Sequence, residues 1–187
     1  LLLIVDAAVQ RPPLLLPAGA GAGAQSGPRA MACSPEIRKM FAQLQAQPPN
    51  KVCVDCSSRI PQWASTTYGT YMCLECSGIH RSMGVHISFV QSVTMDSWKN
   101  ARYVAKMKGG GNGAFNDFLA AHGVPENVIK GAAGTSEPQR LREKYHARAT
   151  GLYKDKMDAL AEGRPWSAPA PEPYKNLAPA APGAVSG

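Results

Sequence analysis

The sequence contains no run of about 20 apolar residues, the length that a helix needs to cross the hydrocarbon core of a bilayer. None of its 187 residues is therefore predicted to span a membrane. The apolar opening LLLIVDAAVQRPPLLLP also lacks the basic start of a secretory signal peptide, and Asp6 and Arg11 interrupt it. No GxxxxGK[ST] phosphate loop is present, and GGGN at 109–112 predicts a turn instead. The sequence therefore predicts no nucleotide site of its own.

Acidic residues are scarce as well. The chain carries 13 Asp and Glu against 20 Lys and Arg, which gives a net charge of +7. Such a surface favours nucleic acid, an anionic membrane or an acidic protein as partner. One side of the helix expected after Asp96 is basic and has no acid close to it in the sequence, so it is either a solvated or a partner-facing side. Its basic residues are Lys99, Arg102, Lys106 and Lys108.

Low-complexity segments lie on both sides of one candidate domain. Residues 1–33, which include AGAGAGAQSG, are predicted to form a disordered N-terminal extension, and Met31 resembles a fresh translation start. Residues 167–187 are rich in Pro and Ala and cannot bury enough surface to offset the entropy of ordering, so they are predicted to be a disordered linker. The domain is expected to cover residues 34–166.

The first elements of this domain are signalled by capping residues and by alternation. Ser34 followed by Pro35 predicts a helix start, and Pro48 is expected to stop that helix. Alternating apolar residues over 85–93 predict a half-buried strand.

Further helices are expected downstream. Asp96 and Asn112 are predicted to cap two of them, and residues 124–138 are predicted to form a linker. One long final helix is expected to end at Gly163, with Trp166 folding back onto the core.

Cysteine is also rare, and four of the five cysteines form two CxxC pairs separated by sixteen residues: Cys53/Cys56 and Cys73/Cys76. Two pairs at this spacing are typical of a tetrahedral Zn²⁺ site. Two disulfides, a redox CxxC or an iron–sulfur site would use the same side chains. A redox motif is usually a single CxxC near a βαβ pattern, which is absent here, so zinc is favoured and iron remains the alternative. Cys33 has no obvious mate, which fits a reducing compartment.

A zinc ion held by four cysteines has no open coordination position, so it is expected to be one structural ion. Arg81 follows Cys76 closely, where a metal-held turn and a short helical segment would fix its backbone. Its guanidinium is always charged and presents a planar fork of donors that suits phosphate oxygens. An arginine near a zinc site is weak evidence by itself, because most such residues are surface or ion-pair residues.

The full pattern is more specific. The motif C-x2-C-x16-C-x2-C-x4-R continues as CLECSGIHRSMGVHISFVQSVTMDSW, then GGN, and closes with ALAEGRPW. Over residues 34–166 this resembles the catalytic domain of Arf GTPase-activating proteins, in the branch that carries this domain at the N-terminus. The resemblance implies an α+β (mixed α/β) fold, in which a small zinc-containing domain has a short central sheet surrounded by helices.

The same resemblance implies the function and the roles of individual residues. The domain would stimulate GTP hydrolysis on GTP-bound Arf-family GTPases, with Arg81 as the catalytic arginine finger. GTP and Mg²⁺ would belong to the partner, so this chain would act as a GTPase activator rather than as an enzyme with its own nucleotide site. Cys53, Cys56, Cys73 and Cys76 would bind Zn²⁺, and the residues expected to contact the partner are Trp63, Ile79, His86 and Ser88.

Arf proteins act in vesicle-mediated transport, so the resemblance also implies a cytoplasmic protein that associates peripherally with Golgi or related membranes. An anionic membrane surface is a further expected partner. Two departures from the family pattern stand out. Gln91 occupies a position where relatives commonly carry a basic residue, and the linker at 124–138 is longer than usual.

Two other functions are compatible with parts of the sequence. A GATA-like zinc finger has similar CxxC spacing, but such DNA-binding proteins place a basic helix directly after the second pair. Here that place holds VHISFVQSV, so no nucleic-acid partner is expected. A non-catalytic scaffold that binds an Arf without accelerating hydrolysis is the second alternative, and the intact Arg81 argues against it.

Overall fold

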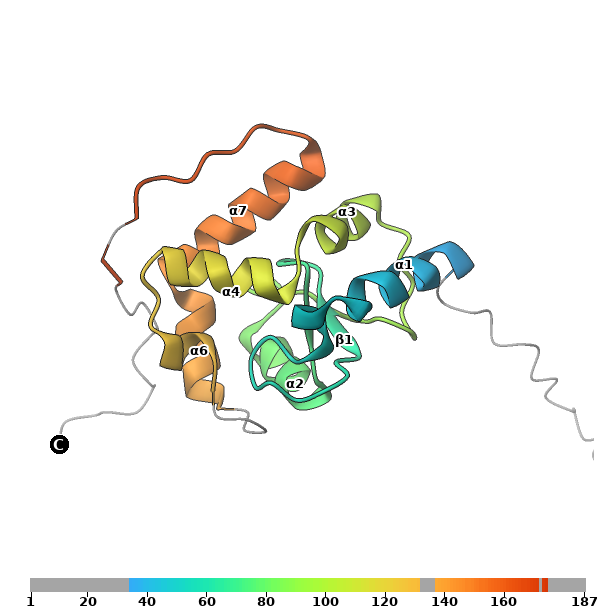
Figure 1. The fold of residues 1–187 in the computed structure, drawn as a ribbon, viewed down its shortest axis with the longest axis horizontal. Coiled ribbons are helices and arrows are strands. Elements are labelled where there is room, and N and C mark those ends of the chain that lie inside the picture. Colours follow the sequence, from blue (N-terminus) through green and yellow to red (C-terminus); the bar gives the residue numbers. More distant parts are fainter. Residues whose placement is uncertain (1–33, 132–136, 172, 175–187) are drawn as a thin grey trace, which may run out of the picture. The chain divides into compact units, whose positions relative to one another are not determined.

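The computed structural model describes residues 34–131, 137–171 and 173–174. The predicted extension at 1–33 and residues 175–187 of the predicted linker lie outside the described residues, so both predictions stay untested. The described part is α+β, as expected: a small antiparallel sheet has helices on both of its faces (Figure 1). The helices are α1 (Pro35–Ala46), the 3₁₀ turn η1 (Pro48–Lys51), α2 (Leu74–Met83), α3 (Ala101–Gly109), α4 (Asn112–Ala121), α5 (Glu126–Ile129), α6 (Pro138–His146) and α7 (Arg148–Glu162).

The sheet holds three short strands in the order β2-β1-β3: β1 (Trp63–Ser65), β2 (Thr70–Met72) and β3 (Val90–Ser92). Trp63 of the central strand lies opposite Met72 on one side and Ser92 on the other. Side chains alternate across a strand, so Trp63 and Ala64 join different cores. Ala64 packs below α1 in a cluster with Phe41, Tyr71, Val93, Trp98 and Met107. Trp63 packs against the larger cluster, which contains the four cysteines and side chains of α4, α6 and α7.

The start of α1 confirms the capping prediction. The Ser34 hydroxyl accepts a hydrogen bond from the Ile37 amide, and Pro35 occupies the first helical turn. The helix ends at Ala46, before Pro48, as expected from a residue that cannot donate the next helical hydrogen bond.

The strand predicted over 85–93 is shorter than expected. Residues 85–87 form a turn instead, in which the amides of Ile87 and Ser88 both bond to the Gly84 carbonyl. Gly84 has φ +97°, a conformation that glycine adopts without strain. The alternation of apolar residues therefore extended beyond the segment that pairs with β1.

The predicted caps of α3 and α4 were misplaced. Asn100 caps α3, whereas the Asp96 carboxylate accepts a hydrogen bond from the Ser92 amide at the end of β3. Asn112 is the first residue of α4, and its side chain bonds to both backbone groups of Tyr71. Asp96 thus bonds to a backbone amide four residues before it, whereas Asn112 bonds to a strand 41 residues away, and neither side chain caps the helix that follows it.

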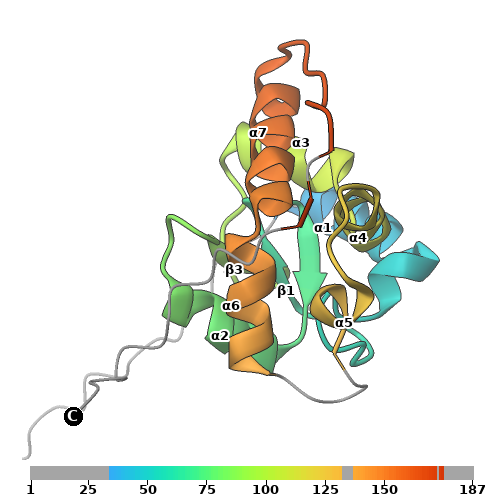
Figure 2. The same cartoon turned by 90° about the vertical axis from the view of Figure 1, so that its left-hand side faces the viewer.

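The C-terminal region also differs from prediction. The expected linker contains α5, and the expected single long helix is two helices separated at Ala147, whose backbone is extended. Before this break α6 lies beside α2, the helix that Cys73 caps, and after it α7 packs along α3 (Figure 2). The ends are as predicted: Gly163 terminates α7 in the left-handed conformation, and the Trp166 ring lies 5.9 Å from that of Phe118.

The basic side of α3 is compensated by acids from α7, which lie far away in the sequence. Lys106 Nζ lies 2.6 Å from Asp158, and Arg102 pairs with Glu162. Lys106 is thus withdrawn from solvent, whereas Arg102 is paired but still 53% exposed, so Arg102, Lys99 and Lys108 make up the solvated side of this helix.

Candidate metal centre and arginine site

The two CxxC pairs meet in the core. All four cysteines are buried, and their sulfur atoms lie within 4.8 Å of one another. The first pair lies in the loop before β1. In the second pair, Cys73 caps the N-terminus of α2, and its sulfur accepts a hydrogen bond from the Cys76 amide. The Cys53 sulfur accepts one from the Asp55 amide in the same way. The fold therefore brings together the complete ligand set that the spacing predicted.

The geometry suits a single Zn²⁺ ion. With Zn–S bonds of about 2.3 Å, the sulfurs of a tetrahedral site lie about 3.8 Å apart, and the sulfurs of Cys56 and Cys73 are separated by 3.5 Å. All four are free thiols, which does not support the disulfide alternative. A hydrogen bond from Cys76 lowers the pKa of the Cys53 thiol to about 6, whereas burial raises that of Cys73 to about 12. One thiol is thus easier to deprotonate than usual and the other harder. A divalent cation would favour the thiolate form of both, because it offsets the cost of burying several thiolates.

Arg81 lies on the last turn of α2, the helix that Cys73 begins. The Gly84 amide closes this helix by bonding to the Arg81 carbonyl, so both ends of the segment are fixed. The Arg81 side chain is exposed, and its guanidinium carbon lies 4.5 Å from the centre of the Trp63 ring. A guanidinium over an indole gains a cation–π attraction without giving up its hydrogen-bond donors. The residue predicted as the arginine finger is therefore in contact with Trp63, one of the residues predicted to contact the partner.

Beneath α2 lies a buried polar network that the sequence reasoning missed. Asp55, between the two cysteines of the first pair, is fully buried. Its Oδ1 accepts hydrogen bonds from Lys144 Nζ at 2.9 Å and from the Tyr145 hydroxyl at 2.9 Å, and its Oδ2 lies 3.1 Å from His80 Nε2. Burial by itself raises the pKa of Asp55, but the Lys144 ammonium and His80 outweigh it and hold that pKa well below its ordinary value.

The network links the metal loop to the arginine helix. His80 immediately precedes Arg81, and its other ring nitrogen lies 2.7 Å from the Ser88 hydroxyl. That hydroxyl is in turn 2.8 Å from the hydroxyl of Ser65 in β1. Because His80 is held at both nitrogens and is fully buried, the rotation of α2 is fixed and Arg81 faces outward. An acid inside a CxxC pair and a His before the Arg were the available sequence signals.

The residues predicted to contact the partner differ in how far they are exposed at the surface. Trp63 and Ile79 are partly buried against the larger core, and His86 is exposed just after Gly84, with its carbonyl 3.0 Å from Lys154 Nζ. Ser88 is only 1% exposed, so its assignment to the partner surface is corrected: its hydroxyl is enclosed by His80 and Ser65.

Two further observations concern the surroundings of the site. Across the residues that the structure describes, no helix combines the length and the apolar character needed to cross a membrane. Gln91, at the position that departs from the family pattern, donates a hydrogen bond to the Ser97 carbonyl.

Comparison with known proteins gives one consistent family. The ArfGap family model, described as "Putative GTPase activating protein for Arf", matches residues 38–158. ADP-ribosylation factor GTPase-activating protein 3 of Pongo abelii is 39% identical over 126 residues, which are 67% of this chain and 22% of that protein. The ADP-ribosylation factor GTPase-activating protein GCS1 of Saccharomyces cerevisiae is 39% identical over 130 residues, 70% of this chain and 34% of that protein.

A solved structure agrees with the sequence relatives. It is titled as the crystal structure of a "putative GTPase activating protein for ADP ribosylation factor" from Cryptosporidium parvum. It superposes with a TM-score of 0.56 at 32% identity, covering 68% of this chain and 94% of that one. The chain spans only 22% and 34% of the two sequence relatives above. The matched region contains all four clustered cysteines, Arg81 and Trp63, and the chain belongs to the ArfGap family.

Proposed function

We propose that this domain stimulates GTP hydrolysis by a GTP-bound Arf-family GTPase, with Arg81 as an arginine finger. The observation that carries the proposal is the presentation of Arg81: an exposed guanidinium stacked on Trp63, at the end of a helix fixed by a cysteine cluster at one end and by Gly84 at the other. The relatives named as ADP-ribosylation factor GTPase-activating proteins supply the partner class.

The proposed chemistry is electrostatic. GTP hydrolysis spreads negative charge over the γ-phosphoryl oxygens in the transition state, and a positioned guanidinium stabilises that charge more than it stabilises the ground state. An arginine finger supplied in trans is worth on the order of 10³–10⁵ in rate, which corresponds to roughly 4–7 kcal/mol of activation free energy. This chain needs to supply only the arginine finger. The partner would hold GTP, Mg²⁺ and the attacking water.

The metal has a structural part in this proposal. Cys53, Cys56, Cys73 and Cys76 would hold one Zn²⁺ with no open position, so the ion would supply cross-linking of the first loop to α2 and no reactive water. The residues of this chain do the rest. The Trp63 ring would hold the guanidinium by a cation–π contact, and the buried His80 would fix the side of α2 that faces the partner.

The proposed partner surface consists of Trp63, Ile79 and His86 around Arg81. Because Arf proteins act at membranes, we further propose that the domain works at the cytoplasmic face of Golgi or related membranes, in vesicle-mediated transport. The net charge of +7 supports weak attraction to anionic lipid. The structure gives little support to a nucleic-acid function. Two basic side chains of α3 already pair with acids of α7, so they are less available to bind phosphate groups.

Arg81→Lys tests the finger directly. Lysine keeps the positive charge but loses the planar fork, so we expect this variant to fold and to retain zinc while losing most of the stimulated GTPase rate, on the order of 10³-fold. Hydrolysis would be measured on liposomes with several GTP-loaded Arf-family proteins, and metal content by mass spectrometry.

Arg102→Lys is the matched control, because Arg102 pairs with α7 outside the arginine site and its replacement should leave the rate unchanged. Full activity of Arg81→Lys would refute the finger assignment. Tight binding of a GTP-loaded Arf by the wild type without any stimulation would instead support the scaffold alternative.

A further inference from the structure

An exposed isoleucine in a strained conformation precedes Trp63 by three residues in the chain. Ile60 has φ +57°, in the left-handed region where a β-branched residue is a genuine outlier, and it is 75% exposed. Its side chain therefore gains little from burial while its backbone carries a conformational cost. Residues held in this way against local preference concentrate at binding sites.

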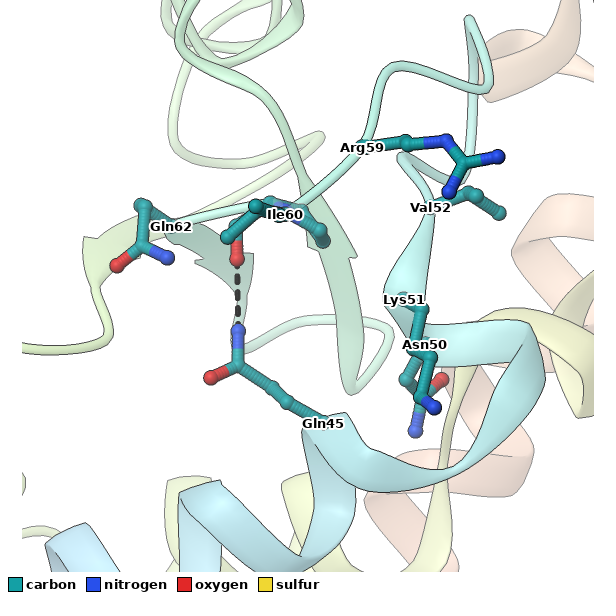
Figure 3. Close-up of a pocket in the computed structure, with 8 residues that line it drawn as sticks. Gln45, Asn50, Lys51, Val52, Arg59, Ile60 and Gln62 are labelled. Atoms are coloured by element: carbon teal, nitrogen blue, oxygen red, sulfur yellow. Dashed lines mark hydrogen bonds between the residues drawn. The ribbon is translucent and has the colours of Figure 1, made fainter.

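The loop around Ile60 is held firmly from both sides. The Ile60 amide donates to the Lys51 carbonyl at 3.0 Å, and Val52 pairs with Arg59 as an isolated antiparallel bridge. From α1, the Gln45 side chain donates to the Pro61 carbonyl at 2.7 Å, shown by the dashed line in Figure 3. The strained backbone is thus imposed by its surroundings, and the Ile60 side chain is presented in a fixed position.

A groove of about 280 Å³ opens between this loop and the end of α1 (Figure 3). Its wall is mainly apolar, and its rim carries two exposed cations, Lys51 and Arg59. Among the described residues, neither cation forms an ion pair, and no acid lines the groove. The other residues that line it include Gln45, Val52 and Pro61. This combination is complementary to an acidic segment that carries one apolar side chain.

We propose that the groove is a second docking site for the GTPase partner, receiving an acidic segment with an apolar side chain against Ile60. The inference rests on the proposed function. Ile60 precedes Trp63 by three residues, so their Cα atoms lie within about 11 Å of each other. The Trp63 ring in turn contacts the Arg81 guanidinium. An interface of ordinary size buries about 800 Å² on each partner, equivalent to a disc of about 16 Å radius. A partner surface of this size centred on Trp63 would therefore have the reach to include Ile60.

Ile60→Asn separates a docking role from a structural one. Asparagine adopts the left-handed conformation far more readily than isoleucine, so we expect the melting temperature to stay equal or to rise. The KM for the GTP-loaded Arf should increase at least about fivefold, as for an interface residue worth more than 1 kcal/mol, with kcat unchanged because Arg81 is intact. Lys51→Gln combined with Arg59→Gln should raise KM similarly and weaken its dependence on salt.

The matched control is Leu160→Gln, which removes another partly exposed apolar side chain, on α7, away from this loop. It should change neither KM nor kcat. Affinity for an Arf-family GTPase loaded with a non-hydrolysable GTP analogue would be measured in parallel, in solution and on anionic vesicles.

Each result decides the question. An unchanged KM and affinity in both groove variants would overturn the inference while leaving the finger intact. Loss of vesicle binding alone, with normal affinity for the Arf in solution, would overturn it in favour of a lipid contact. A wild-type chain that neither binds nor stimulates any Arf would overturn the proposed function and this inference together.

Discussion

Replacing Lys144 tests whether α6 stabilises the metal loop, the loop between Cys53 and Cys56. Its side chain is fully buried, and its ammonium has four oxygen neighbours: Val54 O at 3.1 Å, Asp55 Oδ1 at 2.9 Å, Ile129 O at 2.8 Å and Asn116 Oδ1 at 3.3 Å. Two of these neighbours belong to the loop between Cys53 and Cys56. Lys144→Met keeps the length of the stem and removes only the charged end.

The expected loss of stability in Lys144→Met comes from the Asp55 carboxylate, which would lose its ammonium partner. Asp55 would stay buried with His80 and Tyr145 as its remaining side-chain partners, without the nearest full positive charge. Breaking a buried ion pair by removing one partner costs about 3–5 kcal/mol, whereas the stability of a whole domain is only about 5–15 kcal/mol. The variant should therefore be severely destabilised although it leaves every cysteine in place.

Lys106→Met is the matched control. The Lys106 ammonium also pairs with a carboxylate, at 2.6 Å, but its partner Asp158 is 30% exposed and can be hydrated when the lysine is lost. That pair should be worth about 1 kcal/mol or less. Urea unfolding followed by circular dichroism, with zinc present at pH 7, would compare the two variants. A loss for Lys144→Met no larger than that for Lys106→Met would refute the argument that Asp55 depends on Lys144.

Two further substitutions test the metal and the β1–β2 turn. Cys56→Ser should release zinc and unfold the domain, since structural zinc contributes on the order of 10–16 kcal/mol; a folded variant with full zinc content by mass spectrometry would contradict this role. Gly69→Ala should cost about 2–4 kcal/mol in urea unfolding, because Gly69 has φ +67° and an added Cβ would lie 2.3 Å from the Lys106 carbonyl. Gly151→Ala is the control: an added Cβ there meets nothing within 4 Å, so the change should be neutral or stabilising by up to about 1 kcal/mol. Equal losses of stability at both glycines would contradict the predicted clash at Gly69.

The sequence was informative where the governing interactions are local. The zinc ligand set follows from the spacing of Cys53, Cys56, Cys73 and Cys76, because each pair supplies two sulfurs from one turn of chain. The start of α1 at Ser34-Pro35 and the end of α7 at Gly163 were also predictable, since caps act within a few residues.

The tertiary structure decided what local patterns cannot encode, namely which distant group faces each charge. Asp55 and Lys144 are 89 residues apart in the sequence, and their pairing depends on where α6, which ends before the break at Ala147, packs in the fold. The basic side of α3 has its acids on α7 for the same kind of reason. Periodicity reports which side of a helix is apolar, but not which element will cover it. The sequence thus determined the metal cluster and the arginine, whereas the packing of α6 and of Trp63 determined how that arginine is held.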